Sequence, residues 1–342
     1  MNTIKVGING FGRIGRTLVR EYVRRIAQQQ KCNIEIVAVN NPGDIKTYAH
    51  LLSFDSIQRH FQLNVTCDES SLNVNGYKIS FFQNKNPHEI PWSKLGVQIV
   101  IDSSGYFRDG ETLKQHLGPT VKKVIMCAPG KKLDGTFVMG INHESFNPDK
   151  HHVISNASCT TNCLAPVAKV LDDTFGIVSG LMTTVHSYTN DQNILDSSHS
   201  DLRRARAAAL SMIPTTTGAA KALGDVIPSL VGKLDGYAVR VPTPDVSMLD
   251  LTVVLAKPFS KESINAAMKN AADTNLKNFL SYTELELVSI DFMGSPYSAI
   301  FDAKLTSTVG GMAKVVAWYD NEVGFSNRVL DLAQYVGEKS WH

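Results

Sequence analysis

The chain has 342 residues, 43% of them hydrophobic and 19% charged, a length that favours two domains, each with its own core. No stretch approaches the roughly 18 consecutive apolar residues of a membrane span, and 34 basic against 32 acidic residues give no reason to expect a nucleic-acid or membrane partner. The N-terminal residues show no signal peptide, and the five cysteines form an odd, scattered set. These features favour a reducing, cytoplasmic location.

The first 40 residues predict a βαβ unit. Residues 4–9 alternate apolar and polar side chains as a strand does, and residues 34–39 form a second strand-like run. Between them, apolar residues recur at a helical spacing of four, at Ile14, Leu18, Tyr22 and Ile26. A strand, a helix and a strand within so short a segment imply parallel strands joined by a right-handed crossover.

A glycine pattern joins the first strand to this helix. Gly10, Gly12 and Gly15 form Gly-x-Gly-x-x-Gly, in which the first glycine makes the turn, the second admits a pyrophosphate and the third brings helix and strand close. The helix N-terminus presents free N–H groups to the phosphates. The pattern predicts a dinucleotide site; glycines that serve only the turn are the alternative. Asn40 and Asn41 replace the acidic residue expected at the end of the second strand.

The rest of the chain changes character near residue 157. Before it, short apolar strands at 97–101 and 121–126 are predicted to continue the parallel sheet. After it, longer strands alternate with two predicted helices, and these strands lie at 181–185, 237–241, 249–256 and 315–318. An antiparallel α+β domain is the simplest interpretation. A helix at 325–336 carries Val329, Leu332 and Val336 on one face and is expected to pack on the first domain.

Cys159 is the candidate nucleophile. Asn156 and Ser158 are capping residues directly before a predicted helix, so Cys159 falls in its first turn. The partial positive charge of a helix N-terminus favours the thiolate, which is the nucleophilic form. Cys163, one turn further, is expected to be a small buried hydrophobe, which is also the ordinary alternative for an isolated cysteine. No Cys or His cluster with ligand spacing accompanies the pair, so no metal site is predicted.

His186 is the candidate base among ten histidines. It ends a predicted strand, where a side chain at the rim of a sheet projects toward a cleft. A surface histidine without a catalytic role is the alternative, and its position alone does not separate the two interpretations.

Residues 155–166 read Ser-Asn-Ala-Ser-Cys-Thr-Thr-Asn-Cys-Leu-Ala-Pro, which resembles the active-site segment of the glyceraldehyde-3-phosphate dehydrogenase family nearly letter for letter. Other segments similar to that family span the chain, at 9–15, 186–192, 201–209, 217–221, 240–244 and 318–322. The resemblance implies an α/β protein with a Rossmann dinucleotide-binding domain and an α+β antiparallel-sheet catalytic domain. It places the first at 1–157, completed by a C-terminal helix at 322–342, and the second at 158–321. It also implies a homotetramer.

The same resemblance implies the chemistry. Cys159 attacks an aldehyde, His186 activates the thiol, hydride passes to NAD, and inorganic phosphate attacks the resulting thioester to give 1,3-bisphosphoglycerate. Thr189 and Arg240 match the pocket for the substrate's own phosphate. The residues that match the pocket for the attacking phosphate are Ser158, Thr160, Arg204, Thr217 and Gly218. Hydroxyls, backbone N–H groups and guanidinium groups bind such dianions in fixed geometry.

The positions that match cofactor contacts in the family are Gly10, Gly12, Arg13, Ile14, Ser104, Cys127 and Asn321. Asn321 is expected to orient the nicotinamide carboxamide. Cys127 departs from the family pattern, which has serine or threonine there, so the hydroxyl hydrogen bond of that pattern is not expected at this position. Phe325 departs as well, because the family has tyrosine near the nicotinamide.

Three positions are similar to relatives that accept NADP as well as NAD. Asn41 lacks the charge that repels a 2′-phosphate. Ser198 lies in a loop, residues 196–199, whose small hydroxyl residues resemble the photosynthetic branch, and Lys85 matches a basic residue near the adenosine. Ordinary polar loop residues without consequence are the alternative. We therefore predict NAD as the cofactor, with NADP also accepted.

Two other functions compete with this one. Erythrose-4-phosphate dehydrogenase is a relative with the same cysteine and histidine, and residues 282–287 and Phe325 look somewhat like that branch. Residues 217–221 favour phosphorolysis, because that branch replaces them. A nucleotide-binding protein that has lost its chemistry is the second alternative, and intact Cys159 and His186 argue against it.

Overall fold

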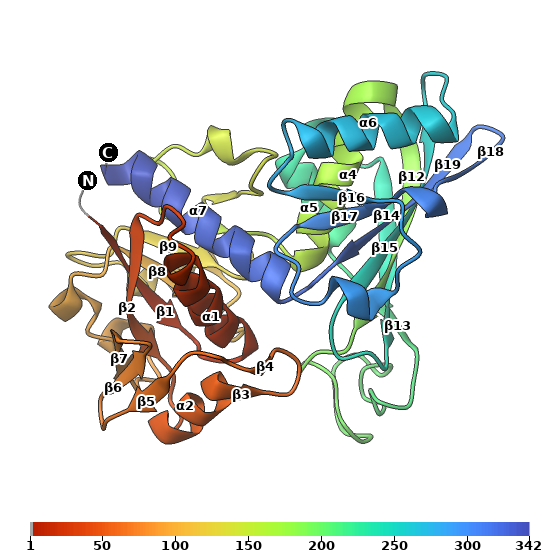
Figure 1. Cartoon of the computed structure of the whole chain (residues 1–342). Coiled ribbons are helices and arrows are strands. Elements are labelled where there is room, and N and C mark those ends of the chain that lie inside the picture. Colours follow the sequence, from red (N-terminus) through yellow and green to blue (C-terminus); the bar gives the residue numbers. More distant parts are fainter. Residues whose placement is uncertain (1–2, 342) are drawn as a thin grey trace. The chain divides into compact units, whose positions relative to one another are not determined.

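The computed structural model describes residues 3–341 and divides the chain into two compact units. Unit 1 consists of the residues up to Phe137, residues His143–Ala157 and the chain from Ser326 onward. Unit 2 consists of Val138–Asn142 and Ser158–Phe325. The protein is an α/β protein, as predicted, with a separate sheet in each unit (Figure 1).

A nine-stranded sheet forms the centre of unit 1. Its strands, in spatial order, are β10 (Gly135–Thr136), β11 (Val153–Ser155), β9 (Lys123–Met126), β8 (Ile99–Asp102), β1 (Ile4–Asn9), β2 (Ile34–Asn40), β7 (Tyr77–Phe82), β6 (Ser71–Val74) and β5 (Val65–Cys67). All neighbours from β10 to β7 are parallel, and β6 and β5 add an antiparallel edge. The predicted parallel sheet is confirmed. Strands β8 and β9 are buried throughout, as parallel strands covered on both faces must be.

Before the chain enters unit 2, two longer helices accompany this sheet, α1 (Arg13–Ala27) and α2 (Ile45–Ser53). The α2 N-terminus is capped by Asp44, whose carboxylate accepts from Thr47 N at 2.9 Å. Short elements complete the unit: β3 (Phe54–Asp55), β4 (Arg59–His60), α3 (Gly110–Leu113), η1 (Pro87–Glu89), η2 (Trp92–Leu95), η3 (Lys114–His116) and η4 (His143–Ser145).

The glycine turn lies between β1 and α1. Gly10 has φ +93°, and a Cβ there would lie 2.4 Å from the Ser104 backbone. A Cβ at Gly15 would lie 2.1 Å from the carbonyl oxygen of Gly10, whereas one at Gly12 would meet no atom within 4 Å. Packing therefore requires the first and third glycines, and the second leaves open space beside the helix N-terminus.

Helix α7 (Val323–Trp341) ends the chain, and from Ser326 onward it belongs to unit 1. It lies beside α1 (Figure 1), because Arg25 on α1 donates to Asn327 Oδ1 at 2.7 Å and pairs with Asp331 at 2.8 Å. The predicted apolar face is fully buried at Val329, Leu332 and Val336. Packing on the first domain is thus confirmed, although the helix is longer than the predicted 325–336.

Unit 2 is built on an eight-stranded sheet. Its main strands, in spatial order, are β13 (Ile213–Thr216), β14 (Leu234–Val241), β12 (Ile177–Ser187), β15 (Ser247–Leu255), β19 (Met312–Tyr319), β17 (Ala299–Asp302) and β16 (Leu280–Thr283). The remaining strand, β18 (Ser307–Val309), forms a hairpin with β19 that projects from the sheet (Figure 1).

The sheet of unit 2 is mixed, which corrects the expectation of an antiparallel one. Strands β12 and β14 are parallel, as are β16 and β17, and the other pairs are antiparallel. Parallel neighbours require a long connection. Residues 188–233 provide it for the first pair, and residues 284–298 for the second. Side-chain periodicity indicates a strand but does not give its direction.

Three helices belong to unit 2, not the expected two: α4 (Cys159–Phe175), α5 (Ala219–Val226) and α6 (Lys261–Asp273). Helix α5 has only 8 residues, too few for a clear helical period. Short 3₁₀ turns lie at η5 (Pro228–Leu230), η6 (Ser289–Phe292) and η7 (Ala303–Leu305). Within residues 3–341, no helix is both long and apolar enough to cross a membrane.

Candidate active site

Helix α4 presents Cys159 as its first residue. Ser158 is the N-cap, and its hydroxyl accepts a hydrogen bond from Thr161 N at 3.0 Å. Its carbonyl oxygen accepts the first backbone hydrogen bond of the helix, from Asn162 N at 2.9 Å. Cys163, one turn further, is fully buried, as expected of a small hydrophobe. The local sequence therefore fixes where the helix begins and which thiol faces outward from it.

The structure brings Cys159 and His186 together. Cys159 Sγ lies 3.5 Å from His186 Nε2, although the residues are 27 positions apart. His186 is on β12, and its ring packs edge-on against Tyr319. Both residues belong to unit 2, where α4 packs against β12 and β19. The thiol and the imidazole are thus placed for direct proton transfer.

The other imidazole nitrogen faces two competing partners. His186 Nδ1 lies 2.7 Å from the carbonyl oxygen of Ser187 and 2.8 Å from Arg240 Nη1, which also donates to that carbonyl at 2.9 Å. A neutral imidazole carries one proton, so Nδ1 either donates to the carbonyl or accepts from the guanidinium. When Nδ1 donates to Ser187, Nε2 presents its lone pair to Cys159. The Ser187 carbonyl therefore favours the tautomer that can act as a base.

Burial dominates the ionisation of both groups. It raises the pKa of the Cys159 thiol, and Arg240 and the first-turn groups of Thr160 only partly offset that rise. This differs from the expected helix-stabilised thiolate, because lost hydration outweighs the partial charge of the helix end. Burial, followed by the charge of Arg240, lowers the pKa of His186 to about 3. The imidazole is therefore neutral at neutral pH and has a lone pair for a proton, but the same burial and charge make it a weaker base in the absence of substrate.

A chain of hydroxyls lies behind the thiol. Tyr319 OH is 2.8 Å from Thr160 Oγ1 and 2.8 Å from Thr184 Oγ1. Burial raises the pKa of Tyr319, so its phenol stays protonated. The Thr160 hydroxyl is thus occupied inside the protein. Its backbone N–H, in the first turn of α4, is the more accessible donor for an anion.

Arg240 keeps part of its donor capacity unused. It lies on β14 beside His186, and its Nε is buried without a hydrogen-bond partner among residues 3–341. Burial lowers the pKa of this guanidinium, which nevertheless stays charged at neutral pH. Thr189, two residues after β12, donates its backbone N–H to Gln192 Oε1 at 3.3 Å. Arg240 therefore offers a positive charge to an incoming anion next to the imidazole.

Arg204 is held in a different setting, in the loop between β12 and β13. Its Nε donates to Thr215 Oγ1 at 2.9 Å, and its Nη2 donates to the carbonyl oxygen of Thr216 at 3.2 Å. Its Nη1 forms an ion pair with Asp191. Asp201 Oδ2 lies 3.7 Å from Nε and accepts from the Thr215 hydroxyl at 2.5 Å. Sequence reasoning did not identify Asp191, because a carboxylate is not expected beside a phosphate ligand.

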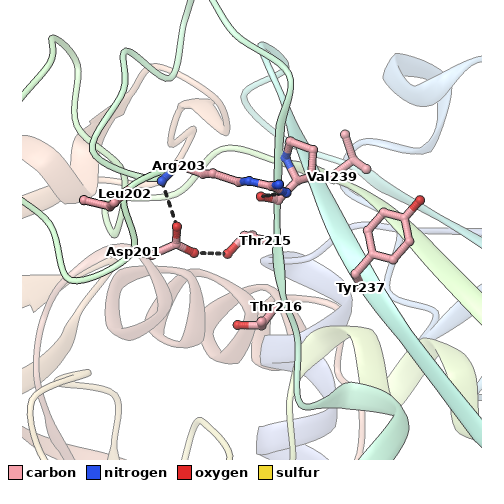
Figure 2. A pocket seen from close by; sticks show the side chains of 8 residues that line it. Asp201, Leu202, Arg203, Thr215, Thr216, Tyr237 and Val239 are labelled. Atoms are coloured by element: carbon pink, nitrogen blue, oxygen red, sulfur yellow. Dashed lines mark hydrogen bonds between the residues drawn. The ribbon is translucent and has the colours of Figure 1, made fainter.

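A cavity of about 680 Å³ adjoins this cluster. Figure 2 shows Asp201 between the backbone of Arg203 and the hydroxyl of Thr215, with Tyr237 across from them. The lining residues are Asp201, Leu202, Arg203, Pro214, Thr215, Thr216, Tyr237 and Val239. Thr217 follows the lining residue Thr216 in sequence, and its Oγ1 accepts a hydrogen bond from Ala219 N at 3.3 Å. Gly218 is the N-cap of α5.

The cofactor candidates of unit 1 lie where its strands end. Ser104 follows β8, and its hydroxyl donates to Asp102 Oδ1 at 2.8 Å. Cys127 follows β9 and donates its backbone N–H to the Asp102 carbonyl oxygen at 2.9 Å; burial raises the pKa of its thiol. Asn9 Nδ2 donates to Asp102 Oδ2 at 2.7 Å. Sequence reasoning missed this buried carboxylate; its only signal is a polar residue at the end of an apolar strand.

Other candidates of unit 1 use their side chains within the protein. Arg13, the first residue of α1, bonds both carboxylate oxygens of Asp55 at 3.1 Å, and Ile14 is the next residue of the helix. Asn41 Oδ1 accepts from Gly43 N at 3.1 Å, which closes a turn after β2. Lys85 is exposed. Arg13 is therefore already paired with a carboxylate, and its place at the start of α1 leaves the backbone N–H groups of the helix as the donors for a phosphate.

Two cofactor candidates belong to unit 2. Asn321 Oδ1 accepts hydrogen bonds from Ser187 Oγ at 2.8 Å and Ser247 Oγ at 3.0 Å, so its amide nitrogen points away from both hydroxyls. Its neighbour Asp320 caps α7 by accepting from Val323 N at 2.7 Å. Ser198 is exposed in the loop between β12 and β13. In the described part of the chain, no three His, Cys, Asp or Glu residues are grouped to hold a metal ion.

Comparisons with known proteins agree along the chain. Residues 4–110 match the NAD binding domain of glyceraldehyde 3-phosphate dehydrogenase, and residues 158–321 match the C-terminal domain of the same family. The curated glyceraldehyde-3-phosphate dehydrogenases of Geobacillus stearothermophilus and Streptomyces coelicolor are each 53% identical to the chain. Glyceraldehyde-3-phosphate dehydrogenase 2 of Trichormus variabilis is 52% identical. Each alignment covers 98% of this chain and 99% of the relative.

Proposed function

The chain belongs to the glyceraldehyde 3-phosphate dehydrogenase family, and we propose that it oxidises glyceraldehyde 3-phosphate with NAD and inorganic phosphate to 1,3-bisphosphoglycerate. The observation that carries this proposal is the 3.5 Å contact between Cys159 and His186, next to Arg240. A thiol, a neutral imidazole and a cation are the groups that an aldehyde bearing a phosphate requires.

In the first step Cys159 Sγ bonds to the aldehyde carbon, and the thiol proton moves to His186 Nε2. NAD, when bound, supplies the hydride acceptor. His186 then takes part in the proton transfer that accompanies oxidation of the hemithioacetal to a thioester on Cys159. Attack by inorganic phosphate breaks the carbon–sulfur bond, releases the acyl phosphate and returns the thiolate of Cys159.

Two sets of residues are proposed to hold the phosphate groups. Arg240 and Thr189 bind the phosphate of the substrate, which anchors the aldehyde near Cys159. The set for the attacking phosphate is Ser158, Thr160, Arg204, Thr217 and Gly218. Guanidinium groups supply charge, and the N-termini of α4 and α5 supply backbone N–H groups.

The residues of unit 1 fit a dinucleotide. The open space at Gly12 beside the start of α1 suits a pyrophosphate. Gly10, Arg13, Ile14, Ser104 and Cys127 are proposed contacts of unit 1, and Asn321 is proposed to orient the nicotinamide amide. The proposed domains are 1–157 with the C-terminal helix 322–342 for the cofactor and 158–321 for catalysis.

NADP is proposed as a second cofactor, with Asn41, Lys85 and Ser198 near its 2′-phosphate. Asn41 is neutral, and its side-chain oxygen accepts a hydrogen bond from Gly43 N, so it does not repel the 2′-phosphate. The test compares catalytic efficiency with NAD and NADP in the native protein and in Asn41→Asp. We expect the aspartate to reduce use of NADP selectively. A native preference for NAD beyond about a thousandfold, roughly 4 kcal/mol, would show that these residues do not admit the phosphate.

A homotetramer in the cytoplasm is proposed for the assembled protein. One face of the sheet in unit 2 contacts α4, and the strands also carry exposed hydrophobic side chains. These are Val178, Leu181, Tyr237, Val254 and Met312, with exposed fractions from 36% to 68%. Such a surface is typical of a subunit interface. Sedimentation at micromolar concentration checks the tetramer, and the 37.5 kDa monomer would contradict it.

The decisive assay for the reaction mixes protein, NAD and aldehyde with and without inorganic phosphate. We expect glyceraldehyde 3-phosphate to be the better substrate and turnover to require phosphate. Preference for erythrose 4-phosphate with release of the free acid would favour the erythrose-4-phosphate branch. Absence of any NAD reduction would favour a catalytically silent nucleotide-binding protein; the names of the relatives favour neither alternative.

A further inference from the structure

Asp191 forms an ion pair with the guanidinium of Arg204, which the proposed reaction needs in order to bind phosphate. All three nitrogens of Arg204 are engaged, with Thr215 Oγ1, the Thr216 carbonyl and Asp191. The first two partners are neutral, and Asp191 is an anion. An incoming phosphate therefore competes directly with this carboxylate for Arg204 Nη1. The side chain of Asp191 is 40% exposed, so packing does not prevent it from moving.

His199 offers the same carboxylate a second partner. The backbone N–H of Asp201 donates to His199 Nδ1 at 2.8 Å, so this nitrogen carries a lone pair. In the neutral imidazole the proton is consequently on Nε2. That nitrogen lies 3.9 Å from Asp191 Oδ1, just beyond hydrogen-bond distance. A small rotation of the carboxylate brings it onto this donor and away from Arg204.

We propose that Asp191 is an internal anion of the attacking-phosphate site, which occupies Arg204 when phosphate is absent and moves to His199 when phosphate binds. The inference rests on the proposed function, because it takes Arg204 as a ligand of that phosphate. The exchange keeps Arg204 paired in both states. The competition also makes phosphate bind more weakly than it would to an Arg204 with no carboxylate beside it. Asp191 is therefore a residue that determines affinity and specificity but does not take part in the reaction.

The first test is Asp191→Asn, which removes the charge and keeps the shape. The Michaelis constant for phosphate should fall about fivefold, equivalent to about 1 kcal/mol, the upper range for an exposed ion pair. The constant for the aldehyde should change less, because the charge of Asp191 is a minor influence on Arg240. The matched control is Asp196→Asn, because Asp196 pairs with Arg206 at 2.8 Å on the same loop and both side chains are mostly exposed. This variant should leave both constants unchanged.

The second test removes the alternative partner. In His199→Phe the displaced carboxylate loses its donor, so the Michaelis constant for phosphate should rise about twofold, as expected for a weak hydrogen bond. In the double variant with Asp191→Asn, the change at His199 should have no further effect. A purely structural role for His199 would instead give the same change in both backgrounds. Thermal unfolding of each variant verifies that it is folded.

An unchanged or higher Michaelis constant for phosphate in Asp191→Asn overturns the inference. Asp191 would then have no effect on phosphate binding, or it would orient Arg204 for phosphate. Failure of the proposed function gives a different result, namely oxidation that is absent or independent of phosphate in the native protein. In that case calorimetric titration with inorganic phosphate replaces the kinetic assay. Tighter binding by Asp191→Asn than by the native protein supports the inference, and equal or weaker binding refutes it.

Discussion

Arg240 and Arg204 carry the same charge in opposite settings. Arg240 Nη1 lies 2.8 Å from the neutral imidazole of His186 and donates to the neutral carbonyl of Ser187, and its Nε has no hydrogen-bond partner in the part of the chain that the structure describes. Arg204 is paired with Asp191 and lies 3.7 Å from Asp201. An anion at Arg240 meets a guanidinium that forms no ion pair in the described residues, although the charge of Asp191 also acts on it, whereas an anion at Arg204 displaces a carboxylate already bound there. We therefore expect the two proposed phosphate sites to differ in affinity.

The two arginines also differ in whether they contact His186. Arg240 Nη1 lies 2.8 Å from the nitrogen of His186 and contributes to its lowered pKa. A phosphate drawn to Arg240 neutralises that charge and weakens its effect on the imidazole. Arg204 has no such direct contact with His186. A ligand at Arg240 is thus expected to change the pKa of His186 more than a ligand at Arg204 does.

The largest effect is expected from Cys159→Ser, which removes the group that both arginines serve. Oxidation should fall by at least about a thousandfold, because a hydroxyl is a far weaker nucleophile at neutral pH. Binding of NAD, measured by calorimetry, should be retained. Substantial oxidation by this variant would mean that another residue forms the thioester.

Replacing His186 with asparagine tests the base beside Arg240. We expect turnover to fall about 10²- to 10⁴-fold, the usual contribution of a positioned general base. Saturating both aldehyde and phosphate isolates this step from binding. A loss smaller than about tenfold would assign proton transfer to water or to another group.

Arg240→Leu should chiefly weaken binding of the aldehyde. Loss of hydrogen bonds to a charged group predicts a Michaelis constant raised about 10- to 150-fold. The variant should also raise the pKa of His186, because removal of the guanidinium makes the imidazolium less unfavourable. Nitrogen NMR of labelled histidine reports this pKa. An unchanged pKa would show that the charge of Arg240 does not contribute to it.

Among the substitutions of the two arginines and the Cys159–His186 pair, Arg204→Leu should give the smallest change. Because phosphate at Arg204 already competes with Asp191, the Michaelis constant for phosphate is expected to rise only about tenfold. The constant for the aldehyde should rise less. If instead the aldehyde constant responds more strongly, the two arginines serve the opposite phosphate groups and the comparison must be reversed.

Features that depend on neighbouring residues were predictable from the sequence. The glycine turn, the Ser158 cap and the apolar face of α7 each arise from spacing within one element. The parallel sheet of unit 1 followed from a strand, a helix and a strand in short succession. These features are determined by residues close together in the chain, so they can be predicted from one sequence.

Features that depend on distant residues were not predictable. The pairing of Asp191 with Arg204 and the hydrogen bond from Asn9 to Asp102, 93 residues apart, come from tertiary packing. The pKa of Cys159 is a similar case, since the sequence shows the helix end but not the burial that opposes it. The parallel pairs in unit 2 depend on the path of long connections, which residue periodicity does not encode.

The proposed reaction requires that Cys159 carries a thioester that only phosphate releases efficiently. A single mixing experiment with excess NAD and glyceraldehyde 3-phosphate, but no phosphate, tests it directly. We predict a rapid burst of one reduced nicotinamide per active chain, an acyl group on Cys159 detected by mass spectrometry, and steady turnover once phosphate is added. Steady turnover at an undiminished rate without phosphate, or a burst with no adduct on Cys159, would contradict the account.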